Sequence, residues 1–102
     1  MIHEDYLITL NVPPDLEDAV VDCLLNFDNN QGFTSFAINA HDHQQQLGLS
    51  LAEQVSGRQR KIRFQMHVDK KSVAEVVNTL KNDFSGSGMR YWVMPLLGHG
   101  VL

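Results

Sequence analysis

The chain has 102 residues, of which 43% are hydrophobic, and it carries a formal net charge of −4. This length holds a single domain, residues 1–102, with room for a hydrophobic core. The negative charge argues against general binding to nucleic acid or to an anionic membrane, which requires a positive field. No apolar stretch approaches membrane-spanning length and Met1–Asp5 does not resemble a signal peptide, so we expect no membrane insertion. The single cysteine, Cys23, excludes an intramolecular disulfide and favours a cytoplasmic location; we expect it to be a small core residue.

The first half of the chain predicts a strand, a helix and a second strand. Residues 5–12 alternate in polarity, which is typical of a strand with one covered face. Apolar residues at spacings of three and four then predict a helix over 14–28, and the prolines and acidic residues at its start suit a helix amino terminus. The glycine-containing turn at 29–32 ends this helix. A strand over 33–41 follows, with Phe36, Ile38 and Ala40 on one face.

The second half repeats the pattern. Alternation over 58–68 predicts a strand whose central inward residue is Phe64. Asp69 is the expected N-cap of a helix over 70–84, which the glycine-rich segment 85–88 terminates. The last strand covers 89–96, and Pro95 indicates that it lies at the edge of the sheet.

The order β-α-β-β-α-β predicts an α+β ferredoxin-like sandwich. Right-handed crossovers place the strands in the order 4-1-3-2, all antiparallel, with both helices on one face. The other face of the sheet, called the open face below, can be solvated or can meet copies of the chain in an oligomer. The residues expected on it are Leu7, Thr9, Ala37, Asn39, Lys61, Arg63 and Gln65.

Basic and glycine residues form one group of candidate ligand residues. Half of the basic residues gather at the start of the third strand, where they can form intersubunit salt bridges or bind an anion. Gly86 and Gly88 can be a simple helix stop or a ligand-binding loop, because glycine lets backbone amides approach a phosphate closely. The topology places this turn and the loop at 42–57 at the same end of the sheet. The basic residues are Arg58, Arg60, Lys61 and Arg63.

Histidines form two further groups. His41 and His43 flank Asp42 and point the same way on an extended chain, and imidazole with carboxylate suits zinc, nickel or copper. At the opposite end of the sheet, the topology brings together His3, His67 and His99. Ordinary exposed histidines are the alternative for both groups.

The whole chain resembles the PII and CutA superfamily. The resemblance rests on the element order, the long polar loop after the second strand, and the glycine-bearing turn before the fourth. Gln54–Arg60 and Gly88–Pro95 resemble more closely a small uncharacterised PII-like family, often encoded beside heavy-metal efflux systems. The resemblance implies a homotrimer whose sheets face inward, with clefts for small ligands between subunits.

The resemblance also implies where a ligand would bind. Gly86, Gly88 and Arg90 match the type of residue that PII proteins use to hold nucleotide phosphates, and Arg58 lies at the base of the loop after the second strand. Two departures are evident. Residues 42–57 contain no tyrosine, so the modification site of nitrogen-regulatory PII proteins is absent, and residues 96–102 contain no arginine to close over a nucleotide. The cofactor is therefore unknown.

These observations favour a non-enzymatic PII-like sensor or adaptor that reports a small ligand through the 42–57 loop. The ligand would be an anionic small molecule near Arg58, Gly86, Gly88 and Arg90. The alternating leucines of the 42–57 loop can dock on a partner protein. The alternative is a CutA-like protein that binds a divalent metal through His41 and His43 and serves heavy-metal tolerance or efflux. No nucleophile, Walker-type phosphate loop or carboxylate pair indicates an enzyme.

Overall fold

The computed structural model describes residues 4–27, 32–41 and 59–102. The predicted 42–57 loop, with its leucines, therefore lies outside the described residues. The element order agrees with the prediction, and the boundaries differ by a few residues, most at the first helix, which begins with a 3-10 turn and ends at Leu25. The elements are β1 (Asp5–Val12), η1 (Pro14–Leu16), α1 (Glu17–Leu25), β2 (Phe33–Ala40), β3 (Gln59–Asp69), α3 (Lys70–Asp83) and β4 (Arg90–Leu96).

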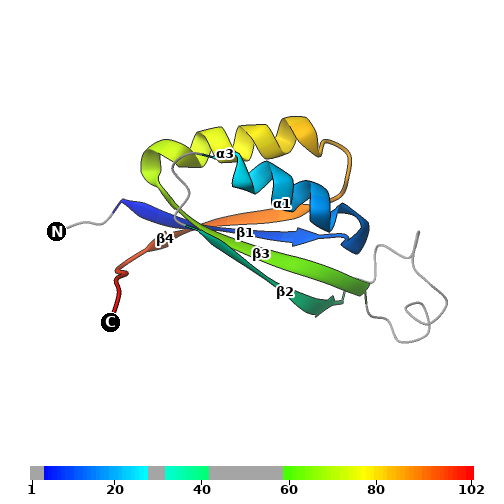
Figure 1. The fold of residues 1–102 in the computed structure, drawn as a ribbon, viewed down its shortest axis with the longest axis horizontal. Coiled ribbons are helices and arrows are strands. Elements are labelled where there is room, and N and C mark those ends of the chain that lie inside the picture. Colours follow the sequence, from blue (N-terminus) through cyan, green and yellow to red (C-terminus); the bar gives the residue numbers. More distant parts are fainter. Residues whose placement is uncertain (1–3, 28–31, 42–58) are drawn as a thin grey trace.

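The sheet has the strand order β2-β3-β1-β4, with every neighbouring pair antiparallel. Both helices cover one face of it (Figure 1). This confirms the predicted ferredoxin-like α+β sandwich, including the edge position of β4 that Pro95 indicated. Within the described ranges, no helix is both long and apolar enough to cross a bilayer.

The core lies between the sheet and the two helices. Alternate residues of β1 and β3 point into it because one face of each strand is covered, and every third or fourth residue of the helices completes it. Phe64, at the centre of β3, is completely buried, as predicted. Cys23 is half-buried against this core. The fully buried hydrophobic residues are Ile8, Leu10, Val12, Val20, Leu24, Phe64, Met66, Val68, Val76 and Leu80.

Local signals at both ends of α3 form as the sequence indicates. The side chain of Asp69 accepts a hydrogen bond of 2.9 Å from the backbone N–H of Ser72, which makes Asp69 the N-cap. Beyond α3, Gly86 and Gly88 adopt φ angles of 79° and 78°, a region that only glycine enters without strain. The turn between α3 and β4 therefore requires both glycines.

The predicted facing of β2 is wrong. Phe36 pairs with Arg63 and Ile38 with Lys61, so Phe36 and Ile38 lie on the open face. Ala37 pairs with Ile62 and Asn39 with Arg60, which places Ala37 and Asn39 on the helix side rather than on the open face. An apolar alternation shows that a strand has one apolar face, but it does not show which face of the sheet that is. The pairing with β3 decides it.

Candidate functional site

The carboxyl-terminal end of β1 brings two arginines together on the open face. Asn11 pairs with Arg63 of β3 on one side and with Arg90 of β4 on the other. Directly opposed residues of neighbouring strands share a face of the sheet, so the three side chains lie on the same surface. Arg63 Nε donates a hydrogen bond of 2.9 Å to Asn11 Oδ1. Asn11 thereby fixes one of the two guanidinium groups.

The ring of Trp92 lies near both of these arginines. The guanidinium carbons of Arg63 and Arg90 are each 5.8 Å from the centroid of the indole ring. A cation at this distance is attracted to the negative face of the ring. The indole therefore attracts both guanidinium groups to the same part of the open face.

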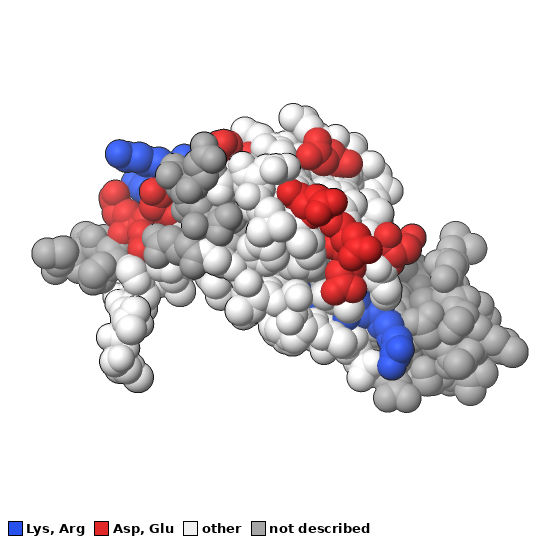
Figure 2. All heavy atoms as spheres, in the orientation of Figure 1, with Lys and Arg blue, Asp and Glu red and all other residues white. Residues whose placement is uncertain are grey.

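These residues line a hollow of about 260 Å³ on the open face. Lys61 and His41 also line it, and no aspartate or glutamate of the described part of the chain does. In the view of Figure 2, by contrast, acidic side chains gather over the helix layer. Guanidinium groups bind carboxylates and phosphates in a bidentate manner. The hollow is therefore chemically suited to a small anion. Its lining residues are Asn11, Ile38, Asn39, Ala40, His41, Gln59, Lys61, Arg63, Gly88, Arg90 and Trp92.

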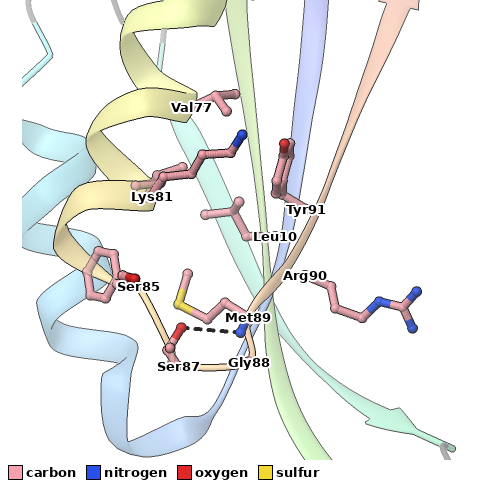
Figure 3. A pocket seen from close by; sticks show the side chains of 12 residues that line it. Leu10, Val77, Lys81, Ser85, Ser87, Gly88, Met89, Arg90 and Tyr91 are labelled. Carbon is pink, nitrogen blue, oxygen red and sulfur yellow. Dashed lines mark hydrogen bonds between the residues drawn. The ribbon is translucent and has the colours of Figure 1, made fainter.

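The glycine turn borders a second hollow, of about 340 Å³, on the helix side of β4. Figure 3 shows Lys81, Met89 and Tyr91 around it, whereas the side chain of Arg90 points away. The backbone N–H of Met89 is already bound to Ser87 Oγ at 3.2 Å, within the turn. This second hollow therefore lacks the guanidinium group that the open face has.

The predicted ligand residues divide between these two hollows. Gly86 lines only the helix-side hollow, and Gly88 and Arg90 line both, although the guanidinium group of Arg90 belongs to the open face. Arg58 lies outside the described residues. In the sequence, Lys61 and Arg63 belong to one basic group and Arg90 stands apart from it. The antiparallel pairing of β3 and β4 with β1 is the signal that would have joined them.

The predicted metal ligands His41 and His43 receive no support from their surroundings. His43 lies outside the described residues, and His41 lines the same hollow as Lys61, Arg63 and Arg90. Neighbouring positive charges disfavour a cation. Among the residues that the structure describes, no group of three metal-ligating side chains includes His41.

The histidines predicted to meet at the opposite end of the sheet do so in part. His67 and His99 contact each other with ring centroids 4.5 Å apart, whereas His3 lies outside the described residues. Asp5, which no sequence pattern indicated, accepts hydrogen bonds from the Nε2 atoms of His67 and His99. The hydrogen bond from His67 is the main reason that the pKa of Asp5 lies below its ordinary value, against the opposing effect of burial.

Solved structures share this fold at low sequence identity. A DUF3240 family protein from Shewanella baltica OS155 superimposes with a TM-score of 0.81 and 20% identity, covering 99% of both chains. PII of Arabidopsis thaliana bound to citrate gives 0.67 and 18%, covering 92% of this chain and 78% of PII. CPII, a nitrogen regulatory PII-like protein from Thiomonas intermedia K12 bound to ADP, AMP and bicarbonate, gives 0.71 and 10%, covering 95% and 96%. These likenesses establish a PII-like fold.

The sequence comparisons identify the family without assigning an activity. No curated protein matches the sequence. The family model described as "Protein of unknown function (DUF3240)" matches residues 2–102. Because this match spans nearly the whole chain, the protein belongs to the DUF3240 family.

Proposed function

We propose that this protein is a PII-like regulatory protein that binds a small anion on the open face of its sheet. The observation that carries the proposal is the pairing of Arg63 and Arg90 with Asn11 from its two sides, with both guanidinium groups near the ring of Trp92. The fold adds support, because PII of Arabidopsis thaliana is bound to citrate and CPII to ADP, AMP and bicarbonate, all of them anions. The ligand class is therefore a carboxylate, a phosphate or bicarbonate.

The composition of the hollow favours binding without catalysis. Its described lining has no serine, threonine, cysteine, aspartate or glutamate, so His41 has neither a nucleophile to activate nor an acid to orient it there. The remaining side chains of the lining can bind an anion through their positive charge and set the shape of the hollow. A protein of this kind acts by reporting that its ligand is bound.

We propose that the chain works as a homotrimer whose open faces meet. The open face exposes large apolar side chains: Phe36 is 46% exposed, Trp92 39% and Met94 46%. Such a surface favours association. At its centre, Thr9 Oγ1 is buried without a hydrogen-bond partner among the described residues, a cost that a neighbouring subunit can remove. We propose that the loop at 42–57, which follows β2 in the sequence, carries the signal to a partner protein.

Isothermal titration calorimetry with citrate, bicarbonate, AMP, ADP and ATP tests the proposed site. We expect at least one of these anions to bind the parent protein, and Arg90→Ala to weaken it by about 1.5–3 kcal/mol, the scale of a charge-assisted hydrogen bond. Arg63→Ala should have a similar effect. Lys71→Ala is the matched control, because it removes one positive charge from an exposed position on α3, away from the hollow.

Two outcomes would contradict the proposal. If none of the five anions binds, the open-face hollow is not an anion site, and docking of a partner protein becomes the better hypothesis. If Lys71→Ala weakens binding as much as Arg90→Ala does, the anion responds to net charge and not to the hollow. Light scattering of the parent protein at micromolar concentration should give the mass of three chains, and a clean monomer would remove the intersubunit part of the proposal.

The alternative function is a CutA-like, metal-binding role in heavy-metal tolerance or efflux, through His41 and His43. The cations around His41 weigh against it. It predicts that replacing both histidines with alanine abolishes zinc or copper binding and leaves the trimer intact. Retention of metal binding by the double variant would exclude it.

A further inference from the structure

At the end of the sheet opposite the anion hollow, one carboxylate and two imidazoles converge. Asp5 Oδ2 lies 2.8 Å from His67 Nε2 and 2.6 Å from His99 Nε2. One ligand atom from each of these residues lies within 4.8 Å of the others, and no other such trio occurs in the described part of the chain. The three side chains come from positions far apart in the sequence, so their meeting is a product of the fold.

The topology explains why they meet. Asp5 begins β1, in register with Leu96 at the end of β4. His99 follows three residues after Leu96 and so returns toward Asp5. His67 lies on the open face of β3, in register with Leu7, two positions along β1 from Asp5. Alternate residues of a strand share a face, so Asp5 and His67 point to the same side of the sheet.

The three groups are of the kinds that bind a divalent transition metal. Zinc is bound by imidazole nitrogens and carboxylate oxygens at about 2.0–2.2 Å, and three protein ligands commonly leave its fourth position to water or another donor. His67 and Asp5 are about one-fifth exposed and His99 somewhat more, at 20%, 19% and 38%. The three side chains are therefore partly shielded but remain open to an ion from solvent.

We propose that Asp5, His67 and His99 form a binding site for a divalent transition-metal ion such as zinc. With Asp5 ionised, each Nε2 now donates its proton to the carboxylate. Binding requires a lone pair on that nitrogen, so the proton moves to Nδ1 of the same ring or leaves to solvent. The ion then takes the position between the three side chains, and the charge of Asp5 offsets part of the charge of the ion.

This site is independent of the proposed anion site. Asp5 and Asn11 are six residues apart on β1, which corresponds to about 20 Å at about 3.3 Å per residue. The surroundings also differ in sign, because the anion hollow is lined by Lys61, Arg63 and Arg90 whereas the histidine cluster contains a carboxylate. A metal would tie the start of β1 to β3 and to the segment after β4.

Calorimetric titration with zinc chloride, checked by native mass spectrometry, tests the site. We expect one zinc per chain and a higher urea midpoint in its presence, because a ligand that binds only the folded state stabilises it. Loss of a side chain that only orients a metal ligand typically costs about 10–100-fold in metal affinity, so Asp5→Asn and His99→Ala, which change the ligands themselves, should cost at least ~100-fold. His67→Ala should do the same.

Asp15→Asn is the matched control for Asp5→Asn, because it makes the same change at an exposed aspartate of η1, outside the histidine cluster, and should leave zinc binding unchanged. His99 follows the last strand, so His99→Ala keeps the test valid even if His67→Ala fails to fold. The proposal is overturned if the parent protein does not bind zinc, or if His99→Ala and Asp5→Asn bind it as tightly as the parent. It is also overturned if His41→Ala alone abolishes binding. Arg90→Ala should not change the zinc affinity, so the metal and anion proposals fail separately.

Discussion

Truncation of Phe64 gives a sharp test of the core on which both proposed sites depend. Phe64 is completely buried in the central strand β3, and its ring centroid lies 6.1 Å from that of Phe33. Phe64→Ala removes a ring from a packed core and leaves a cavity, which costs about 3–5 kcal/mol. The lost contact with Phe33 contributes about 0.5–1.5 kcal/mol of this range. Since the total stability of a domain is about 5–15 kcal/mol, the variant should lose a large fraction of it.

The assay is urea unfolding followed by far-UV circular dichroism, at one chain concentration because association shifts apparent stability. Leu25→Ala is the control: Leu25 is 62% exposed near the end of α1, and its truncation should change stability by no more than about 0.5 kcal/mol. Equal shifts of the urea midpoint for Phe64→Ala and Leu25→Ala would refute the assignment of Phe64 to the core. The strand facing of β3, and with it the position of Arg63 and His67 on the open face, would then be in error.

Three further predictions concern the helix cap, the thiol and the open face. Asp69→Ala removes the acceptor for the Ser72 N–H and should lower stability by about 1 kcal/mol in the same urea assay; an unchanged midpoint would mean that the cap does not matter. Burial, assisted by the nearby carboxylate of Asp83, raises the pKa of Cys23, so iodoacetamide should modify the native thiol more slowly than the urea-unfolded one, and equal rates would contradict this. Met94→Glu places a charge on the apolar open face and should reduce the proposed trimer to monomers by light scattering; an intact trimer would place the interface elsewhere.

The central strands show what alternation can predict. β1 and β3 have helices packed on one side, so their fully buried hydrophobic residues recur at every second position of the sequence, and the facing of Phe64 and Arg63 follows directly. Asp69 and the glycines after α3 likewise act locally: Asp69 binds the N–H of Ser72 three residues on, and the glycines act through their own φ angles. Such features depend on neighbours in the chain, and the residues alone predict them well.

The edge strand β2 shows where this reasoning stops. Phe36 and Ile38 alternate as clearly as residues of β1, yet they lie on the open face. The alternation is compatible with either face, and only the hydrogen-bonded register with β3 selects one. If the open face is a subunit interface, as we propose, its apolar side chains reflect contacts with other subunits, which a single chain's helices cannot reveal.

Both proposed sites combine residues that are distant in sequence. Topology places His67 near His99, but the role of Asp5 emerges only when β1, β3 and the segment after β4 are seen in register. Similarly, Arg63 and Arg90 are far apart in the sequence. They come together only because Asn11 of β1 pairs with Arg63 on one side and with Arg90 on the other. The sequence by itself determined the elements, their order and the core, because these depend on local periodicity and chain connectivity. The tertiary structure decided the two clusters, because cross-strand register sets which charged side chains share one face and one end of the sheet.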